Sequence, residues 1–398
     1  MLVLTLNAGS STQKCCLFDA DDSLLWQAVA DWTQVPDQVV VRVQVPGAER
    51  RWHTSERDRR AVLEQMLAAL TTGETAAIPS LAAVGAVAHR VVHGGSRYCQ
   101  ATLVTAEVLG AIRELSALAP LHNPLNAEGI AAMGEMLGAG IPQVAVFDTA
   151  FHQTLPPAAY TYGIPRWWRE QGVRRYGFHG ISHQYVAQRA GVVLGRDWRD
   201  LHLITCHLGN GCSLAAVRQG QCVDTTMGLT PLDGIVMGTR PGSLDPGILL
   251  QWWRQGLSLE QVDHLLNREC GLKGLSGLSS DLRQVLAGVE AGDPDCQLAV
   301  DVFVHRLRAG IGAMLASLGS LDVLVFTAGI GENSPLVRQR ACAGWLGIEL
   351  DTDLNQRTFA ADRVISREGS RVQVLVIHTQ EELALAQQAR QLLAAPPT

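Results

Sequence analysis

Residues 2–18 and 201–217 share one pattern of apolar and polar positions. Each stretch begins with a β-rich apolar run, passes through a tight turn of Gly, Asn and Ser, and ends in a second apolar run. Asn7 and His207 hold corresponding places, about half of the 398 residues apart. A Gly/Ser turn exposes backbone N–H groups and hydroxyls, which is how many proteins hold phosphate. The repeat predicts a duplicated fold with two hairpins that hold a polyphosphate between two lobes.

The remaining pattern predicts an alternation of strands and helices. In the first half we expect strands at 2–6, 15–19, 24–30, 39–45, 83–89 and 143–147, with helices at 56–70, 105–118 and 124–137. In the second half we expect strands at 201–206, 212–217 and 321–326, helices that open at 245–246, 258 and 294, and a last helix at 381–395. This alternation indicates an α/β fold with mixed sheets flanked by helices.

No low-complexity linker separates the two halves, so we expect closely packed lobes with a cleft between them. The last helix is expected to return to the first lobe. The predicted domains are therefore 1–150 with 382–398, and 151–381.

Composition narrows the class of protein. A hydrophobic fraction of 47% with 39 Gly is ordinary for an α/β enzyme. No apolar run approaches the roughly 18 residues that span a membrane, and Met1 leads directly into a strand pattern, so we expect a cytoplasmic protein without a membrane partner. Nine scattered cysteines without CxxC spacing suit reduced, buried thiols. A net charge of −6 argues against a nucleic-acid partner.

Three glycine-containing segments are candidates for phosphate contact. The first turn combines Asn7, Ser10, Thr12 and Lys14, and Lys14 is one of only two lysines among 32 basic residues. The second turn runs from His207 to Gly211. The third, 326–333, follows a strand and precedes a helix start, the place where open α/β sheets bind nucleotides. A polar β-turn is the ordinary interpretation of each turn alone, but together they favour phosphate binding.

Arginine and histidine occur in short polar islands beside apolar strands. These islands contain Arg90, His122, His179 and Arg240, each flanked by Gly, Pro or apolar residues. A surface ion pair or a buried histidine explains any one of them, but four together favour a site. His179 is expected just before a helix that Ser182 caps. A metal-hydrolase interpretation of His179 and His183 fails, since no general-base glutamate lies between them.

Two carboxylates complete the candidates. Asp148 ends a strand with no helix periodicity after it, a favoured catalytic or metal position in an α/β sheet, although a helix cap is the alternative. Thr379 and Glu382 fit a capping box, which would occupy Glu382 with backbone and leave Glu381 to reach a cation.

With these motifs in place, the chain resembles the acetokinase family nearly from end to end. The resemblance rests on LNAGSSTQK at 6–14, HRVVHGG at 89–95, LAPLHNPLN at 118–126, VAVFDTAFHQTLP at 144–156, RRYGFHGISHQYV at 174–186, HLGNGCSLAAV at 207–217, MGLTPLDGIVMGTRPGSLDPG at 227–247 and FTAGIGENSPLVR at 326–338. It implies an actin-like fold of two duplicated ribonuclease-H-like lobes and a homodimer. The implied activity is reversible Mg²⁺-dependent phosphoryl transfer from ATP to acetate, which gives acetyl phosphate and ADP.

The resemblance also implies roles for residues. Asn7 and Glu381 would hold Mg²⁺, with Mn²⁺ as an alternative metal. Arg90 would bind the carboxylate, Asp148 would be the assigned proton donor or acceptor, and His179 and Arg240 would stabilise the transition state. ATP would contact Ser10, Thr12, Lys14, His207, Leu208, Gly209, Asn210, Gly211, Asp281, Leu282, Arg283, Gly329, Ile330, Gly331, Glu332 and Asn333.

A short carboxylate is already ionised at pH 7, so it needs no general base. We therefore expect Asp148 to orient an arginine or a metal-bound water. Val92, Leu121, His122, Phe178 and Pro231 neighbour the candidate residues and are expected to bind the substrate; the β-branched Val92 favours acetate over propionate.

The chain departs from the family pattern at Trp168, Ile181, Pro241, Ala328 and Gln380, none of which removes a charged catalytic group. Two alternatives to an acetate substrate stay open at this point. One is a kinase for propionate or another short carboxylate, and the other is a non-catalytic actin-like ATP-binding module.

Overall fold

A computed structural model describes residues 1–9, 11–357 and 361–395. The chain folds into two compact units. Unit 1 comprises Met1–Ala150 and Gln380–Thr398, and unit 2 comprises Phe151–Thr379. Gln380 and Glu381, which the sequence assigned to the second domain, fall in unit 1 because they open the last helix, α15 (Glu381–Ala394).

An eight-stranded sheet forms the centre of unit 1. Its order is β5-β4-β3-β2-β1-β6-β8-β7. The strands are β1 (Val3–Ala8), β2 (Thr12–Phe18), β3 (Leu24–Val35), β4 (Gln38–Val45), β5 (Ala48–Thr54), β6 (Ala86–Val91), β7 (Thr102–Leu103) and β8 (Gln143–Phe147). Strands β1, β6 and β8 are parallel to one another, and β1 to β5 form an antiparallel meander. Strand β5 was not predicted, because most of its side chains are exposed at the sheet edge and give no apolar alternation.

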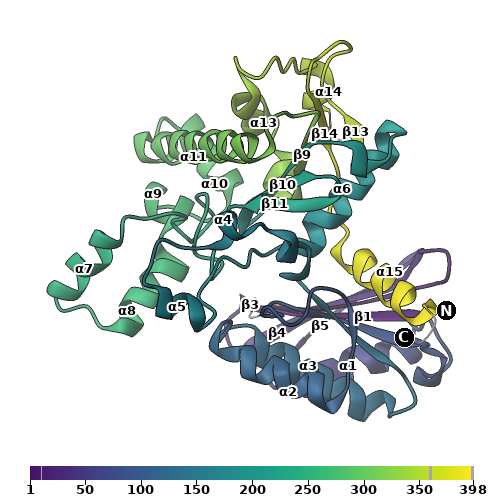
Figure 1. Ribbon diagram of the computed structural model, residues 1–398. Helices are drawn as coiled ribbons and strands as arrows, with labels where there is room; N and C mark the ends of the chain where they lie inside the picture. Colours follow the sequence, from purple (N-terminus) through teal and green to yellow (C-terminus); the bar gives the residue numbers. More distant parts are fainter. Residues whose placement is uncertain (10, 358–360, 396–398) are drawn as a thin grey trace. The chain divides into compact units, whose positions relative to one another are not determined.

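Helices cover both faces of this sheet. They are α1 (Arg59–Thr71), α2 (Ala106–Glu114), α3 (Asn123–Leu137) and α15. Helix α3 approaches β1 closely at Gly129, where an added Cβ would lie 2.9 Å from Leu6. Since side chains alternate along a strand, Leu6 faces α3 and Asn7 points to the opposite face, where α15 packs (Figure 1).

Unit 2 repeats the central part of that sheet. Its order is β11-β10-β9-β12-β14-β13, with strands β9 (Leu203–Leu208), β10 (Cys212–Arg218), β11 (Gln221–Thr225), β12 (Val323–Thr327), β13 (Arg363–Val364) and β14 (Gln373–Val376). An antiparallel meander, β9 to β11, again adjoins two strands parallel to its first strand. Strands β3-β2-β1-β6-β8 and β11-β10-β9-β12-β14 therefore share one connectivity, which is the predicted duplication.

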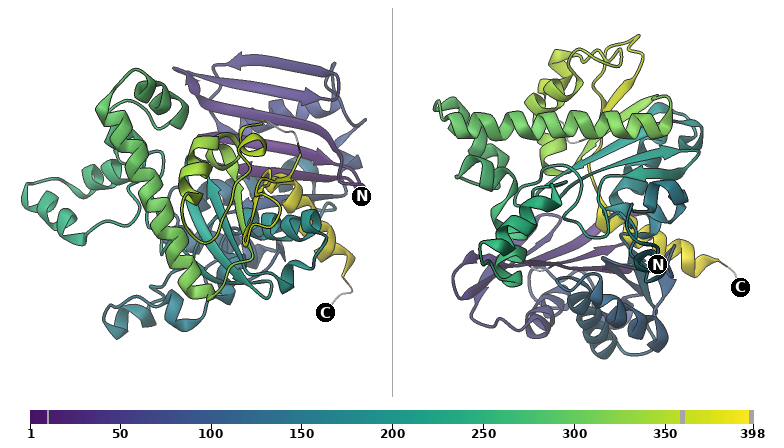
Figure 2. Two further views of the ribbon diagram at one scale, coloured as in Figure 1. Left: turned by 90° about the horizontal axis from the view of Figure 1, so that it is seen from above. Right: turned by 60° about the vertical axis from the view of Figure 1, so that its left-hand side comes forward.

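The helices of unit 2 are α4 (Pro157–Tyr160), α5 (Arg166–Glu170), α6 (Gly180–Leu194), α7 (Pro246–Arg254), α8 (Leu259–His264), α9 (Gly271–Ser276), α10 (Leu282–Glu290), α11 (Pro294–Leu318), α12 (Ala328–Asn333), α13 (Pro335–Cys342) and α14 (Thr352–Gln356). The long helix α11, clear in Figure 2, is capped by Asp293 and passes Leu214 at Gly310. The preceding residue of β10, Ser213, contacts His183 of α6, so α11 and α6 pack on opposite faces of the sheet.

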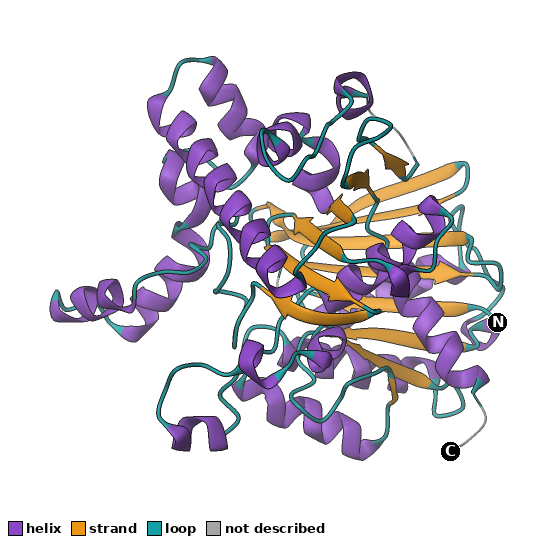
Figure 3. Cartoon of the chain, turned by 45° about the horizontal axis from the view of Figure 1, so that its top comes forward, coloured by secondary structure: helices purple, strands orange, loops and turns teal. Residues whose placement is uncertain are grey.

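Strands thus form the two sheets and helices lie over their faces, as Figure 3 shows. Within the described ranges, the longest helices are not apolar enough to cross a membrane.

Candidate active site

Four elements of unit 1 bring polar side chains to one edge of its sheet. Asn7 lies near the end of β1 and is the register partner of Lys14 on β2. Arg90 lies near the end of β6, and Asp148 directly follows β8. Strands β1, β6 and β8 are parallel, so their carboxyl ends meet at this edge. Glu381 arrives there from the first turn of α15.

Arg90 is the centre of this group. Its Nε lies 3.2 Å from both oxygens of Asp148, and its Nη2 lies 2.5 Å from Oδ2. Its Nη1 donates to Asn7 Oδ1 at 3.2 Å. Burial opposes the charge of Arg90, but Asp148 and Glu381 raise its pKa above the ordinary value. Asp148 is 1% exposed, and its carboxylate accepts hydrogen bonds from the Arg90 guanidinium.

The expected capping box at α15 is wrong. Gln380 occupies the N-cap position and makes no side-chain bond to the helix. Glu382 instead forms an ion pair with Lys14 at 3.0 Å. Glu381 lies 4.0 Å from Arg90 Nε, and burial together with Glu382 raises its pKa against the opposing charge of Arg90. Glu381 therefore stays a predicted metal ligand without the capping argument, and Glu382 contacts Lys14 instead of the helix backbone.

In unit 2, His179 occupies a strained position at the start of α6. It has a φ of 56°, in the left-handed region, which is uncommon for a residue with a side chain. Ser182 does not cap the helix as expected. It lies inside α6, fully buried, and its hydroxyl contacts His207 Nδ1 at 2.8 Å and Thr379 Oγ1 at 3.1 Å.

His179 stacks on His207, with ring centroids 4.1 Å apart and planes 20° apart. Its Nδ1 lies 2.9 Å from the hydroxyl of Ser213, the register partner of His207 on β10. The two predicted histidines therefore come together on the second hairpin.

Arg240 lies beside this stack. Its Nη1 donates to the carbonyl of Pro231 at 2.8 Å, and burial lowers the pKa of the guanidinium. A Cβ added at Gly211 would lie 2.6 Å from Arg240 Nη2 and 3.3 Å from His179 Nε2. Gly211 therefore allows the second turn to approach both groups.

The second turn is held by backbone bonds. The N–H of Gly209 donates to the carbonyl of Gly211 at 3.0 Å, and the N–H of Gly238 donates to the carbonyl of Asn210 at 2.9 Å. Leu208 is fully buried, whereas Asn210 is exposed. The turn thus presents its backbone and Asn210 to solvent, and Leu208 supplies only packing.

Most of the third glycine segment, residues 328–333, forms the short helix α12. Glu332 Oε1 accepts the N–H groups of Ala328 at 2.8 Å and Thr379 at 2.9 Å. Arg338, 1% exposed, donates to the carbonyls of Gly331 and Glu332 at 2.7 and 2.8 Å. These bonds fix the segment while Gly329 and Asn333 stay exposed.

The remaining predicted residues differ in exposure. Asp281 caps α10 and forms a 2.6 Å ion pair with Arg283, while Leu282 is buried. Val92 and Phe178 are buried, Leu121 is 44% exposed, Thr12 is exposed, and Ile330, His122 and Pro231 are half-buried. Ser10 lies outside the described residues.

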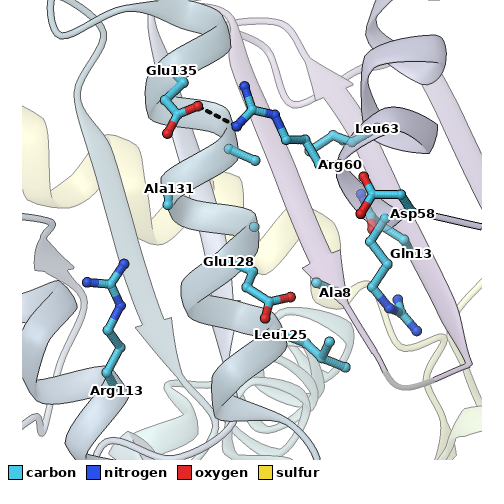
Figure 4. Close-up of a pocket in the computed structure, with 13 residues that line it drawn as sticks. Ala8, Gln13, Asp58, Arg60, Leu63, Arg113, Leu125, Glu128, Ala131 and Glu135 are labelled. Carbon is cyan, nitrogen blue, oxygen red and sulfur yellow. Dashed lines mark ion pairs between the residues drawn. The ribbon is translucent and has the colours of Figure 1, made fainter.

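A separate cavity of about 280 Å³ lies in unit 1, beside α3 (Figure 4). Ala8 and Gln13 line it together with charged side chains, including the ion pair of Arg60 and Glu135 at 2.5 Å. None of the predicted site residues that the structure describes lines this cavity. It is therefore not the candidate active site.

Comparison with known proteins decides the family. The model of the acetokinase family matches residues 2–387. The chain belongs to this family. A protein of Trichormus variabilis named acetate kinase is 53% identical over 405 residues, which cover 99% of this chain and 100% of that protein. The expectation of a kinase of this family is confirmed.

Solved structures of other acetokinase family members also match. The acetate kinase of Porphyromonas gingivalis has a TM-score of 0.92 at 37% identity and covers 98% of this chain and 99% of its own. A propionate kinase of Francisella tularensis has a TM-score of 0.89 at 36% identity and covers 97% of this chain and 98% of its own. These matches confirm the predicted fold class, two duplicated actin-like α/β lobes.

Two departures from the acetokinase pattern have visible consequences. Ala328 takes a φ of 64° and is strained for a residue with a Cβ. Gln380 occupies the N-cap position of α15 and makes no cap bond. Ile181 is buried in α6, and Trp168 stacks on Trp167 with both rings partly exposed. Nothing in the structure shows an effect of Pro241 on the Arg240 side chain.

The residues that sequence reasoning missed contact predicted residues directly or, in the case of Thr205, through His183. They are Glu382, Ser182, His183, Thr205, Ser213 and Thr379. The register of the two hairpins is the signal that could have found Ser213, because it pairs with His207 as Lys14 pairs with Asn7.

Proposed function

We propose that this chain transfers a phosphoryl group reversibly between ATP and acetate, forming acetyl phosphate and ADP. The observation that carries the proposal is the bonding of Arg90. Asp148 accepts one N–H of Arg90 Nε and one of Nη2. Asn7 accepts one N–H of Arg90 Nη1. A guanidinium has five N–H groups, so one remains on each Nη nitrogen. Two such donors match the two oxygens of a carboxylate.

Asp148 orients Arg90 in this mechanism and takes no proton. Its carboxylate is buried and bound to the guanidinium on two nitrogens. The substrate carboxylate, with a pKa of about 4, is already ionised near pH 7 and can attack phosphorus directly. An acceptor that needs no base leaves Asp148 free for positioning.

Arg240 and His179 stabilise the phosphoryl group during transfer. Negative charge spreads over its equatorial oxygens while a second anion approaches, so the reaction needs positive charge and hydrogen-bond donors placed in advance. Arg240 supplies a half-buried cation whose described bond goes to a backbone carbonyl rather than to a carboxylate. His179 supplies a ring nitrogen beside it.

The donor set near Arg90 fits a divalent cation. Asn7 and Glu381 offer hard oxygen atoms, which Mg²⁺ prefers, and Mg²⁺ commonly uses one or two carboxylates together with phosphate oxygens and water. Three carboxylates, Asp148, Glu381 and Glu382, here face two cations, Arg90 and Lys14. Asn7 and Glu381 would hold Mg²⁺, or Mn²⁺ in its place. The ion would neutralise phosphate charge when bound.

The nucleotide contacts are proposed on the hairpin turns and α12. Lys14 would contact phosphate together with the first turn, including Ser10 and Thr12. The turn from His207 to Gly211, the exposed residues of α12 and the segment Asp281–Arg283 would bind the rest of ATP. Glu332 would support this contact through its bonds to Ala328 and Thr379.

Acetate is proposed as the better substrate than propionate. Val92 is buried, and its N–H is held by Asn126 at 3.0 Å, so this β-branched side chain cannot readily move aside. One methylene usually changes binding by only about 1–3 kcal/mol, so propionate would be a slower substrate.

The test is an assay for acyl phosphate. The protein is incubated with ATP, Mg²⁺, hydroxylamine and either acetate, propionate or butyrate, and acyl hydroxamate is measured. We expect product with acetate, less with propionate, and none without ATP. No hydroxamate from any of the three acids would refute the proposal and favour a non-catalytic ATP-binding module.

Assembly and location follow from the same resemblance. We propose a cytoplasmic homodimer that binds neither nucleic acid nor membrane. All nine cysteines are free thiols, as suits a reducing compartment. Light scattering coupled to size exclusion would measure the mass, and a monomer at micromolar concentration would contradict the dimer.

A further inference from the structure

An irregular segment of unit 2, residues 226–240, follows β11 and carries Arg240 at its end. It forms neither helix nor strand, yet none of its residues is exposed. Buried backbone N–H and C=O groups that lack partners in a helix or a sheet must bond elsewhere. The groups that bond to this segment therefore determine its path up to Arg240.

Arg175 donates to three consecutive carbonyls at the start of this path. Its Nη1 lies 3.0 Å from the carbonyl oxygen of Thr225, 2.6 Å from that of Thr226 and 2.9 Å from that of Met227. Nη1 carries two N–H groups, which the three oxygens share. The oxygens bear like partial charges, so the positive guanidinium holds a curve of the chain that the carbonyls alone would not keep.

The next two residues are held from the same side. The carbonyl of Gly228 accepts the N–H groups of Tyr176 at 3.0 Å and Gly177 at 3.2 Å. The N–H of Leu229 donates to the hydroxyl of Tyr162 at 2.9 Å. A Cβ added at Gly228 would collide with that hydroxyl, so the segment passes directly against Tyr162. Each residue of the segment up to Leu229 is thus bonded through its backbone.

Arg175 also reaches the chain beyond Arg240, through Asp233. Its Nη2 lies 3.3 Å from Asp233 Oδ2. The other oxygen of this carboxylate accepts the N–H of Gly234 at 2.8 Å and the hydroxyl of Ser243 at 2.7 Å. Ser243 follows Arg240 by three residues. The guanidinium of Arg175 therefore bonds to the chain before Arg240 directly and to the chain after it through one carboxylate.

The guanidinium of Arg240 rests on the end of the held stretch. Its Nη1 donates at 2.8 Å to the carbonyl of Pro231, two residues after Leu229. The proline ring fixes φ at this position, so the place of the carbonyl follows the path of the chain before it. A change in that path would move the guanidinium, and a displacement of about 1 Å can cost about 10²-fold in rate.

We propose that Arg175 is a positioning residue for phosphoryl transfer, and that it sets the place of the Arg240 guanidinium through residues 226–231. This role rests on the proposed function and deepens it. The bonds of Arg175 Nη1 and Nη2 go to groups of the chain itself, so it acts on the phosphoryl group only through Arg240. Because Arg240 stabilises the transition state, loss of Arg175 should lower kcat and leave KM nearly unchanged.

A double-mutant cycle tests this coupling. The wild type, Arg175→Met, Arg240→Ala and the double variant are compared in the assay with ATP, Mg²⁺, acetate and hydroxylamine. Methionine keeps an unbranched side chain and has no hydrogen-bond donor. We expect Arg175→Met to lower kcat by about 10²-fold in the wild type. In the Arg240→Ala background it should lower kcat by less than about threefold, because the group that it positions is already absent.

Two further variants separate positioning from loss of structure. Arg175→Lys should retain much more of kcat than Arg175→Met, since an ammonium group carries three N–H groups on one nitrogen and can serve the three carbonyls. Arg166→Met removes an exposed arginine of the same unit, paired with Glu170 at 2.7 Å, and is the matched control with near-normal kcat. In urea denaturation, Arg175→Met should lower the midpoint in both backgrounds, which measures its structural cost separately from the kinetic coupling.

Tyr162→Phe weakens the same segment and serves if Arg175→Met does not fold. It removes the hydroxyl that accepts from Leu229, and should lower kcat in the wild type but not in Arg240→Ala. Equal fold-losses of kcat in the two backgrounds, or no loss in the wild type, would overturn the proposal. Hydroxamate from the wild type together with equal losses would refute the positioning role alone, whereas no hydroxamate from the wild type would refute the proposed function and the role of Arg240 with it.

Discussion

The β1–β2 and β9–β10 hairpins have the same construction and different chemistry. In each, the N–H of a glycine that directly follows the first strand donates to a carbonyl further along the chain. Gly9 donates to Thr12 at 2.8 Å, and Gly209 donates to Gly211 at 3.0 Å. Each also pairs a polar residue near the end of one strand with one near the start of the next. In the first hairpin these are Asn7 and Lys14, and in the second they are His207 and Ser213.

These pairs lead into opposite kinds of network. Around the first hairpin, the bonds join charged groups, with Arg90 between Asp148 and Glu381. Around the second, the bonds described for the histidines run mainly to hydroxyl groups and one backbone carbonyl. The duplication thus preserved the backbone that forms each turn, while the paired positions diverged. Unit 1 thereby carries charged groups suited to bind a metal ion and a carboxylate, and unit 2 carries groups suited to donate hydrogen bonds.

The largest expected effect comes from removing the arginine of each network. Arg90→Ala should lower kcat/KM by about 10³-fold or more, the range found for arginines in phosphoryl transfer. It should also lower the free energy of unfolding by roughly 3–5 kcal/mol, because the buried carboxylate of Asp148 loses its cation. Steady-state kinetics and urea denaturation measure both effects. Arg60→Ala, which removes an exposed arginine of the same unit, is the control and should keep near-normal activity.

Arg240→Ala should cause a similar loss of kcat with a smaller loss of stability. The bond described for its guanidinium goes to the carbonyl of Pro231, so no buried carboxylate is left behind. Near-normal turnover in either folded variant would refute the assignment of that arginine. Equal losses of stability in the two variants would contradict the contrast between the networks.

The two turns should respond differently to an added methyl group. In Gly211→Ala, the new Cβ would meet Arg240 Nη2 at 2.6 Å and displace it, at little cost in stability because a side-chain end can move. A displacement of about 1 Å can cost about 10²-fold in rate, so we expect kcat to fall by that order. Gly9→Ala is the matched control. Its Cβ would meet only Thr12, at 3.2 Å from the carbonyl oxygen, and should change kcat by only a few-fold. Equal effects in the two variants would show that the second turn does not position Arg240.

Much of this comparison was accessible from the sequence, because the repeat is local. Apolar runs on both sides of a glycine turn predicted both hairpins, and strand ends predicted Arg90 and Asp148 as separate candidates. That they are neighbours came from the parallel pairing of β6 with β8. The positions of single residues that depend on tertiary contacts were not accessible. Ser182 and Glu382 fit helix-capping patterns, yet both side chains bond to groups distant in sequence, His207 and Lys14. A local sequence pattern cannot show that a group distant in sequence competes with the helix backbone for the same side chain.

Acid should weaken both units through buried histidines. The pKa of His89 in unit 1 and of His152 in unit 2 is about 4, chiefly because burial disfavours the charged ring. Above pH 6.5 these rings are neutral in the folded and unfolded chain, and stability is unaffected. Between pH 6.5 and 4 only the unfolded chain takes up the proton, so stability falls as pH falls, by up to about 1.4 kcal/mol per pH unit for each histidine.

Urea denaturation at pH 7.5, 5.5 and 4.5 measures this slope. His89→Gln and His152→Gln keep a hydrogen-bonding side chain. Each should reduce by one the number of protons taken up on unfolding, and so lower the slope of the free energy of unfolding against pH. Stability that does not change between pH 7.5 and 4.5 would show that these rings are not held neutral.

The smallest expected effect concerns the segments that follow β6 and β12. After β6 the chain takes a left-handed φ of 61° at Gly95, whereas after β12 it takes a φ of 64° at Ala328. An alanine in this conformation costs the folded state roughly 1–2 kcal/mol. A glycine removes that strain, but its greater freedom in the unfolded chain offsets about 0.5–1 kcal/mol of the stabilisation. Ala328→Gly should therefore stabilise the protein by up to about 1 kcal/mol, seen as a higher urea midpoint.

The bond from the Ala328 N–H to Glu332 accounts for why the strained conformation persists, and the glycine variant should keep it. Ala341→Gly in helix α13 is the matched control, where glycine in a helix should destabilise by about 1 kcal/mol. If Ala328→Gly also destabilises, the strain is not real. If it stabilises and leaves the KM for ATP unchanged, the side chain of Ala328 costs stability without contributing to nucleotide binding.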